Sequence, residues 1–183
     1  MFNHSIRFSK NIRHDVAIKI FISVLFLCLV GPFKIDIPSQ LPITLQSLAV
    51  LLVAIWFGWR IGIVATVVYI FLGAIGTPVF AGATYGIEKL NGTSAGFFLG
   101  FILSGIVCGI LSEKIKFQKQ KMNLLLWFAG HIIILFFGIV WMSFLGNDIS
   151  AFPMLLPGAV IKSVAGWVLT LILLQYFKKE KLS

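Results

Sequence analysis

Apolar residues are gathered into six long stretches along the chain, and shorter polar segments separate them. The stretches cover residues 16–33, 43–57, 61–76, 95–111, 122–145 and 157–177. A helix needs about 17–25 mainly apolar residues to cross the hydrocarbon of a bilayer, so six transmembrane helices are the simplest prediction. The second and third stretches are near or below that length, and only Trp59 and Arg60 clearly separate them. These two could instead form a helical hairpin that does not cross fully.

The composition points to the same class of protein. Of the 183 residues, 59% are hydrophobic and 11% are charged, and the mean hydropathy is +1.02. Such values are typical of integral membrane proteins. We predict an all-α protein of the cell membrane, surrounded by the lipid bilayer, with one integral membrane domain over residues 1–183. Within it, 1–15 is a basic cytoplasmic segment, 16–177 is a six-helix bundle and 178–183 is a basic cytoplasmic tail.

The positive charges indicate the orientation. With the N-terminus in the cytoplasm, 12 of the 15 Lys and Arg residues fall on the cytoplasmic side: Arg7, Lys10, Arg13, Lys19, Arg60, Lys114, Lys116, Lys119, Lys121, Lys178, Lys179 and Lys181. Cytoplasmic loops are expected to hold this excess, so both termini are predicted to be cytoplasmic. Lys34 and Lys89 fall outside, and Lys162 falls within the last stretch. The net charge of +9 is thus explained by topology and anionic lipid headgroups, without a nucleic acid.

Signatures of catalysis are absent from the sequence. It contains no cluster of metal ligands, no G-x-x-x-x-G-K-[ST] loop and no Ser-His-Asp grouping that would share one surface. Cys28 and Cys108 are expected in opposite halves of the membrane, so they cannot pair. We therefore predict a protein that is not an enzyme and holds no metal or cofactor. Any ATP hydrolysis must come from another chain.

Small residues recur every four positions along the fourth stretch: Gly92, Gly96, Gly100, Ser104, Cys108 and Ser112. They share one helix face, and such a row lets a neighbouring backbone approach closely. We favour close packing inside the bundle. The alternative is a docking surface for a partner.

Two outer connectors differ from simple turns: residues 34–42 and residues 77–94. The second is long for a connection between helices, and it is rich in Gly. Such a loop can fold over a small molecule and offer backbone groups to it. A disordered loop is the alternative.

Lys162 is the chemically unusual residue of the sixth stretch. It lies five residues after Pro157, or about 7–8 Å along a helix, in the outer leaflet. Three interaction partners are considered for its ammonium: the outer lipid headgroups, a carboxylate of the protein, or an anionic ligand in a pocket. We favour the ligand, because none of the six stretches contains an acidic residue. His131, inside the fifth stretch, is expected to hydrogen-bond to another helix rather than to relay protons, because no acid accompanies it.

Three segments resemble a single family, in its order and spacing. They are LPITLQSLAVLL at 41–52, YIFLGAIGTPVFAG at 69–82 followed by GTSAGFFLGF at 92–101, and LPGAVIK at 156–162. They are similar to the BioY proteins, the biotin-specific substrate-capture subunits (S components) of energy-coupling factor (ECF) vitamin transporters. The resemblance implies the six-helix S-component fold with both termini inside, biotin as transported ligand, and partnership with a transmembrane coupling subunit and cytosolic ATPases.

The sequence also departs from the family pattern. Ala159 stands where the family has an aspartate, and Thr93, Ala95 and Phe97 replace its Pro, Gly and Tyr. Without the aspartate, either Lys162 meets the ligand carboxylate with no internal competitor, or the pocket suits a different anionic vitamin. We favour biotin and keep another anionic vitamin as the alternative.

These inferences define a candidate binding site. The pocket is expected to open to the outside, beneath segments 34–44 and 77–94 and over the outer ends of helices four to six. Lys162 is expected to bind the anionic tail. Hydrogen bonds to the ureido ring, or contacts that hold the loop shut, are expected from Thr44, Gln46, Tyr85 and Asn91, and close backbone approach from Gly82 and Gly86.

Two rival functions belong to other classes. A solitary carrier that works without an ATPase would need an ionisable relay, for which His131 and Lys162 are the only candidates. An intramembrane enzyme would need a nucleophile and a base within reach, and no spacing in the sequence supports one.

Overall fold

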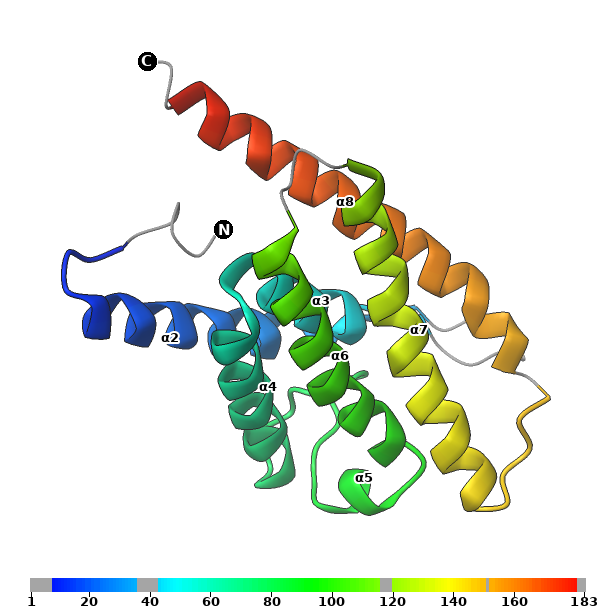
Figure 1. Cartoon of the computed structure of the whole chain (residues 1–183). Helices are drawn as coiled ribbons and strands as arrows, with labels where there is room; N and C mark the ends of the chain where they lie inside the picture. The colour runs from blue at the N-terminus through cyan, green and yellow to red at the C-terminus, as the bar shows by residue number, and fades with distance from the viewer. Residues whose placement is uncertain (1–7, 36–42, 116–119, 151, 181–183) are drawn as a thin grey trace.

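The structure is a computed structural model that describes residues 8–35, 43–115, 120–150 and 152–180 (Figure 1). Its elements, in order, are α2 (Ile12–Val30), β1 (Lys34–Ile35), β2 (Ile43–Thr44), α3 (Gln46–Phe57), α4 (Trp59–Ala74), α5 (Glu88–Asn91), α6 (Ala95–Lys114), α7 (Gln120–Phe144), η1 (Phe152–Met154) and α8 (Leu155–Glu180). Each of the six predicted apolar stretches corresponds to one of the longer helices, which confirms the all-α prediction. Segment 36–42 and the charges at Arg7, Lys116, Lys119 and Lys181 lie outside the described residues.

The first helix begins earlier than the hydropathy pattern predicts, at Ile12 instead of Val16. Asn11 caps it, because its side-chain oxygen accepts a hydrogen bond from Arg13 N at 3.0 Å. One turn later Lys19 Nζ lies 2.6 Å from Asp15 Oδ2, an i,i+4 ion pair. The polar residues that precede the apolar stretch therefore form the first turn of the helix. As a result, Asp15 lies inside the helix.

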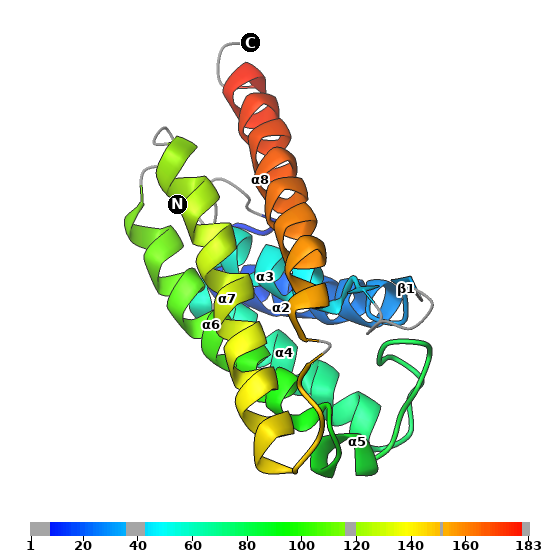
Figure 2. The same cartoon turned by 90° about the vertical axis from the view of Figure 1, so that its right-hand side faces the viewer.

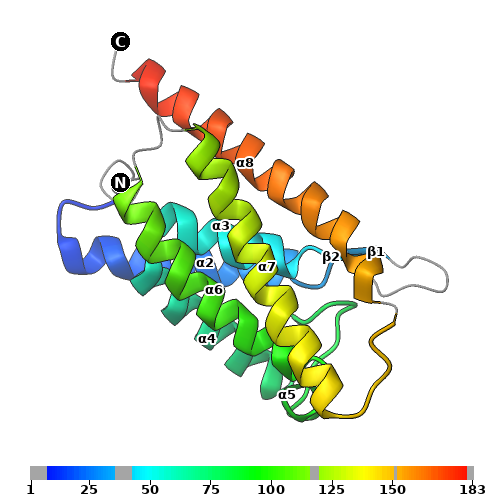
Figure 3. The ribbon, with the colours of Figure 1, turned by 45° about the vertical axis from the view of Figure 1, so that its right-hand side comes forward.

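The central element is α3. Nine of its 12 residues are buried, and it contacts α2, α4, α6, α7 and α8. Figures 2 and 3 show it in the middle of the bundle, with α7 and α8 passing in front of it. A helix that is apolar on all sides is stable only when it is enclosed, which explains its place in the core.

The row of small residues on α6 serves packing within the bundle. A Cβ at Gly100 would lie 2.9 Å from the Ile134 Cα of α7, and Cys108 Sγ lies 3.6 Å from Leu126 O of the same helix. Gly109 faces the backbone of Trp59 at the start of α4. These close approaches confirm the packing hypothesis. The alternative of a docking surface is wrong for this face, because neighbouring helices cover it.

Within the described residues, three helices are long and apolar enough to cross a membrane: Ala95–Lys114, Gln120–Phe144 and Phe152–Tyr176. Helices α3 and α4 have 12 and 16 residues. At 1.5 Å per residue they are about 18 and 24 Å long, shorter than the hydrocarbon core of about 30 Å. The second and third stretches are therefore short, as predicted. Figure 1 shows α5 at one end of the bundle and the C-terminal half of α8 at the other.

Candidate ligand-binding site

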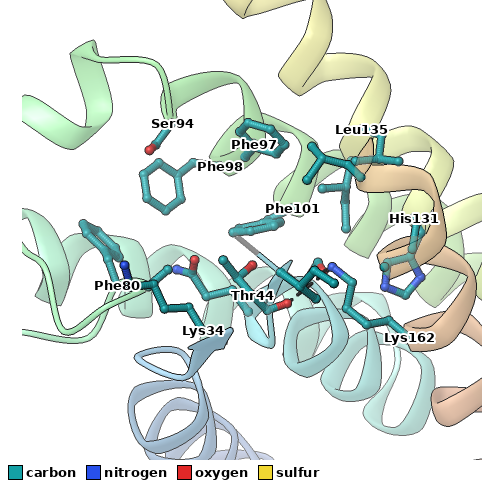
Figure 4. Close-up of a pocket in the computed structure, with 18 of the residues that line it drawn as sticks. Lys34, Thr44, Phe80, Ser94, Phe97, Phe98, Phe101, His131, Leu135 and Lys162 are labelled. Carbon is teal, nitrogen blue, oxygen red and sulfur yellow. Dashed lines mark hydrogen bonds between the residues drawn. The ribbon is translucent and has the colours of Figure 1, made fainter. Parts of the chain in front are cut away.

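A cavity of about 380 Å³ lies where β1, β2 and the start of α3 meet α6, α7 and α8 (Figure 4). Its apolar lining consists of Ile43, Phe80, Ala81, Phe97, Phe98, Phe101, Ile134, Leu135, Met142, Leu155, Gly158 and Ala159. Its polar lining consists of Lys34, Thr44, Gln46, Ser47, Thr84, Lys89, Thr93, Ser94, His131 and Lys162. This size, with apolar walls and a few polar groups, is typical of a small-molecule site.

The apolar side of the cavity is built around phenylalanines. Phe98 and Phe101 extend from α6, and Phe80 reaches them from the segment after α4; the ring centroids of Phe80 and Phe98 are 4.7 Å apart. Phe80 is itself fixed edge-on against Tyr69, with the centroids 5.8 Å apart. The result is a stiff aromatic wall that suits the apolar body of a ligand.

The described lining of the cavity carries basic groups and no acidic ones. Three lysines line it, and none of the described aspartates and glutamates does. Among the described acidic side chains, Asp15 pairs with Lys19, and Glu88, Glu113 and Asp148 are exposed. Hydrogen bonds from the Ser150 backbone and hydroxyl occupy the Asp148 carboxylate and hold its pKa below the ordinary value. The cavity is therefore suited to a ligand that carries its own negative charge.

Lys162 lies in the second turn of α8, and its side chain points into the bundle. Its Nζ donates to Ser47 Oγ, at the start of α3, at 2.7 Å, and to Thr44 O, in β2, at 3.3 Å. An ammonium has three N–H donors, so one remains for a ligand. Of the three partners considered for Lys162, the structure excludes outer headgroups and a carboxylate partner within the described residues.

Gln46 connects the cavity wall to the outer segment. Its Nε2 donates to Tyr69 Oη at 2.5 Å, and Tyr69 Oη donates to Val79 O at 2.8 Å. Both side chains are buried, so this chain of hydrogen bonds fixes the start of α3 against the segment that follows α4. The amide oxygen and the second N–H of Nε2 are then the groups of Gln46 that remain for a ligand.

Segment 77–94 is ordered, in contrast to the alternative of a disordered loop. An isolated bridge pairs Phe80 with Thr84, and Gly82 N donates to Pro32 O at 2.8 Å. Gly82 and Gly86 have φ of +73° and +107°, conformations that glycine adopts readily.

The structure brings only part of the predicted site together. Lys162, Thr44 and Gln46 line the cavity, whereas Gly82, Tyr85, Gly86 and Asn91 do not. The two glycines form turns, Tyr85 is 54% exposed, and Asn91 is exposed at the end of α5. Any contact of these four residues with a ligand stays a prediction. The same segment presents other groups to the cavity, among them Phe80, Thr84 and Lys89.

Lys34 belongs to the cavity although the sequence analysis assigned it only to the outer side. The β1–β2 pairing places Lys34 opposite Thr44, and its side chain crosses Gly82, where a Cβ would lie 2.7 Å from Lys34 Cε. In Figure 4, Lys34 and Lys162 lie on opposite sides of the cavity. The cavity therefore has cationic groups at both ends.

His131 lies at the Lys162 end of the cavity (Figure 4). Its Nδ1 is 2.9 Å from Ser163 Oγ of α8 and 3.0 Å from Trp127 O of its own helix. The predicted hydrogen bond from His131 to another helix is therefore confirmed.

Comparison with known proteins gives consistent results. The family model described as the BioY family matches residues 5–179. "Biotin transporter BioY2" of Lactococcus lactis subsp. cremoris is 36% identical over 118 residues, which cover 64% of this chain and 64% of the relative, slightly less than two thirds of its length. "Biotin transporter BioY" of Thermotoga maritima is 38% identical over 124 residues, which cover 67% of this chain and 72% of the relative.

A solved structure shares the fold. It is described as the S-component for biotin from an ECF-type ABC transporter, and it matches 91% of this chain and 94% of its own length with a TM-score of 0.71. The sequence identity is 22%, so this likeness concerns the fold alone.

Proposed function

The chain belongs to the BioY family, and from this we propose that it is the substrate-capture subunit of an ECF transporter that takes up biotin. It is a multi-pass protein of the plasma membrane and a transport protein, not an enzyme. Relatives named as biotin transporters support biotin as the ligand, and the likeness to a biotin S component supports the fold.

One observation carries the proposal: Lys162 lies in a cavity with aromatic walls, and no carboxylate of the described residues lines that cavity. Biotin has an apolar bicyclic body and aliphatic chain, a polar ureido group and one carboxylate. A ligand of this kind fills the apolar part and neutralises the excess positive charge. Thr44 and Gln46 lie along the wall between the two charged ends.

The ligand carboxylate has two proposed positions. The sequence assigns it to Lys162, whose third N–H is free for a ligand. Lys34 and Lys89 offer a second position beside segment 77–94. In both arrangements Lys162 contacts the ligand directly.

The proposed topology has six crossings with both termini in the cytoplasm. The distribution of Lys and Arg supports it. The short α3 and α4 cross as a pair inside the bundle, where protein instead of lipid surrounds α3. The cavity, on the side of α5, then faces outward.

Transport is proposed to need a transmembrane coupling subunit and cytosolic ATPases. The test is biotin uptake by cells that express this chain with and without these subunits. Uptake that requires the subunits supports the proposal, whereas equal uptake in their absence would favour a solitary carrier.

Binding itself is tested on the purified chain in detergent. Mass spectrometry of co-purified small molecules and titration with biotin should both identify biotin as a ligand. A panel of other anionic vitamins serves as the control, since Ala159 stands where the family has an aspartate. Saturable binding of another vitamin and not of biotin would overturn the assignment of substrate.

A further inference from the structure

One buried polar atom of the cavity has no partner in the part of the chain that the structure describes. His131 is 2% exposed and lines the cavity, yet its Nε2 makes no hydrogen bond within the described residues. A buried nitrogen without a hydrogen bond costs about 1–3 kcal/mol in general, so a partner beyond the described residues, either a ligand group or a water, is expected.

The other ring nitrogen defines what kind of partner is needed. Nδ1 lies 3.0 Å from the backbone carbonyl of Trp127, which can only accept, so Nδ1 carries the proton. Ser163 Oγ, 2.9 Å from Nδ1, fits this tautomer, because its hydroxyl donates to Ala159 O at 2.8 Å. In the neutral ring Nε2 is then a hydrogen-bond acceptor.

Burial and the neighbouring cation both favour a neutral ring. His131 is 2% exposed and lines the cavity together with Lys162, and no carboxylate of the described residues lines it. A second cation beside Lys162 would be unfavourable, and a ligand carboxylate would be repelled by the Nε2 lone pair. The partner that fits Nε2 is a neutral N–H or O–H donor, and of the two biotin's ring offers N–H groups.

We infer that His131 Nε2 accepts a hydrogen bond from an N–H of the ligand, next to Lys162, which donates to the adjacent carbonyl. This inference rests on the proposed function, since the ureido ring of biotin carries a carbonyl between two N–H groups. The ureido ring then lies at the Lys162 end of the cavity. The carboxylate lies towards Lys34 and Lys89, the reverse of the orientation assigned from the sequence.

The first test uses wild-type protein, so it does not depend on a variant that folds. Biotin and its two derivatives methylated at one or the other ureido nitrogen are titrated into the purified chain. The derivative that loses the N–H facing His131 binds at least about tenfold more weakly, equivalent to about 1.4 kcal/mol. Equal binding of biotin and both derivatives overturns the inference, because a bound water would then satisfy Nε2.

The second test separates binding from packing with two variants. His131→Asn keeps a polar group near the Nδ1 position, where it can reach Trp127 O and Ser163, and lacks the Nε2 position. His131→Gln places an amide oxygen near the Nε2 position. We expect about tenfold weaker biotin binding for the Asn variant and a change within about threefold for the Gln variant.

Titrating the methylated derivatives into the His131 variants distinguishes a ligand contact from a structural role, because a structural residue would not change the discrimination between biotin and its derivatives. In His131→Asn, biotin and the methylated derivative should bind alike, because the group that distinguishes them is gone. If the Asn variant keeps full affinity, or still discriminates as strongly as wild type, the inference is wrong while the proposed function stands. If wild type shows no saturable biotin binding, the proposed function fails and the inference fails with it.

Discussion

Two lysines inside the bundle, Lys19 on α2 and Lys162 on α8, have opposite electrostatic environments. Lys19 is 1% exposed, and Asp15 lies one helical turn before it at 2.6 Å. Three and four residues before Lys162, one helical turn away, the chain has Ala159 and Gly158, which carry no charge. The described partners of the ammonium are the Ser47 hydroxyl and the Thr44 carbonyl. Both lysines are enclosed by protein, but among the described residues a carboxylate pairs with Lys19 and none pairs with Lys162.

This difference separates a structural lysine from a ligand-binding one. A buried ion pair is complete without any other molecule, and removing one partner leaves an uncompensated charge. A lysine that has only neutral partners keeps an uncompensated positive charge, which a polar or anionic group of a ligand can stabilise. The two lysines should therefore respond oppositely to the same substitution.

The largest expected effect is on stability, at Lys19. Lys19→Met leaves the Asp15 carboxylate without its cation and should lower the free energy of unfolding by about 3 kcal/mol. This value is at the lower end for a buried ion pair, because the Asp15 side chain is 11% exposed. Thermal unfolding in detergent measures the loss. The Asp15→Asn, Lys19→Met double variant should recover most of it, and biotin affinity should change by less than about threefold in both. A stable single variant with impaired binding would reverse the comparison.

The next effect is on binding, at Lys162. Lys162→Met should weaken biotin binding about 100-fold, or about 2.7 kcal/mol, because a charge-assisted hydrogen bond is lost inside the cavity. The thermal stability of the ligand-free variant should equal or exceed that of wild type, since no countercharge is left behind. Calorimetric titration and thermal unfolding of the same preparation check both statements. Full affinity in this variant would remove Lys162 from the site.

Gln46 is expected to affect both properties to a smaller extent. Gln46→Met removes the donor to Tyr69 Oη and should cost about 1 kcal/mol of stability. The start of α3 then loses its fixed position against the outer segment, and biotin affinity should fall about threefold to tenfold. Tyr69→Phe, which removes both hydrogen bonds of this hydroxyl, should reproduce the loss of stability. Unchanged stability in both variants would contradict the proposed link.

The smallest effects are expected outside the cavity. Tyr85→Ala and Asn91→Ala should each change biotin affinity by less than about threefold, because neither side chain lines the cavity. Thr84→Val, in the same segment but at the cavity wall, is the matched control and should have the larger effect. A tenfold loss in Tyr85→Ala would mean that the outer segment rearranges to bring Tyr85 onto the ligand.

Much of the fold follows from short-range features of the sequence. Runs of apolar residues predict the six long helices, and the scarcity of acids near Lys162 predicts a cavity with unbalanced charge. The start of α2 was misplaced because hydropathy does not register the Asn11 cap or the Asp15–Lys19 pair, both of which favour helix.

The residues that meet in the cavity were harder to predict. Ser47 and His131 approach Lys162 only through packing of three separate helices, so no spacing in the sequence connects them. Lys34 was missed because a two-residue strand pairing brings it opposite Thr44. In segment 77–94, the glycines predict that a ligand approaches the backbone closely. At Gly82 the group that packs against the backbone is instead the side chain of Lys34.

The central claim is that the excess positive charge of the cavity is neutralised by the negative charge of the ligand. The most direct test compares equilibrium binding of biotin with that of biotin amide, which has the same shape and no charge, to wild-type protein. The account predicts that the amide binds at least about tenfold more weakly at low salt. Equal affinity of the two ligands would contradict it.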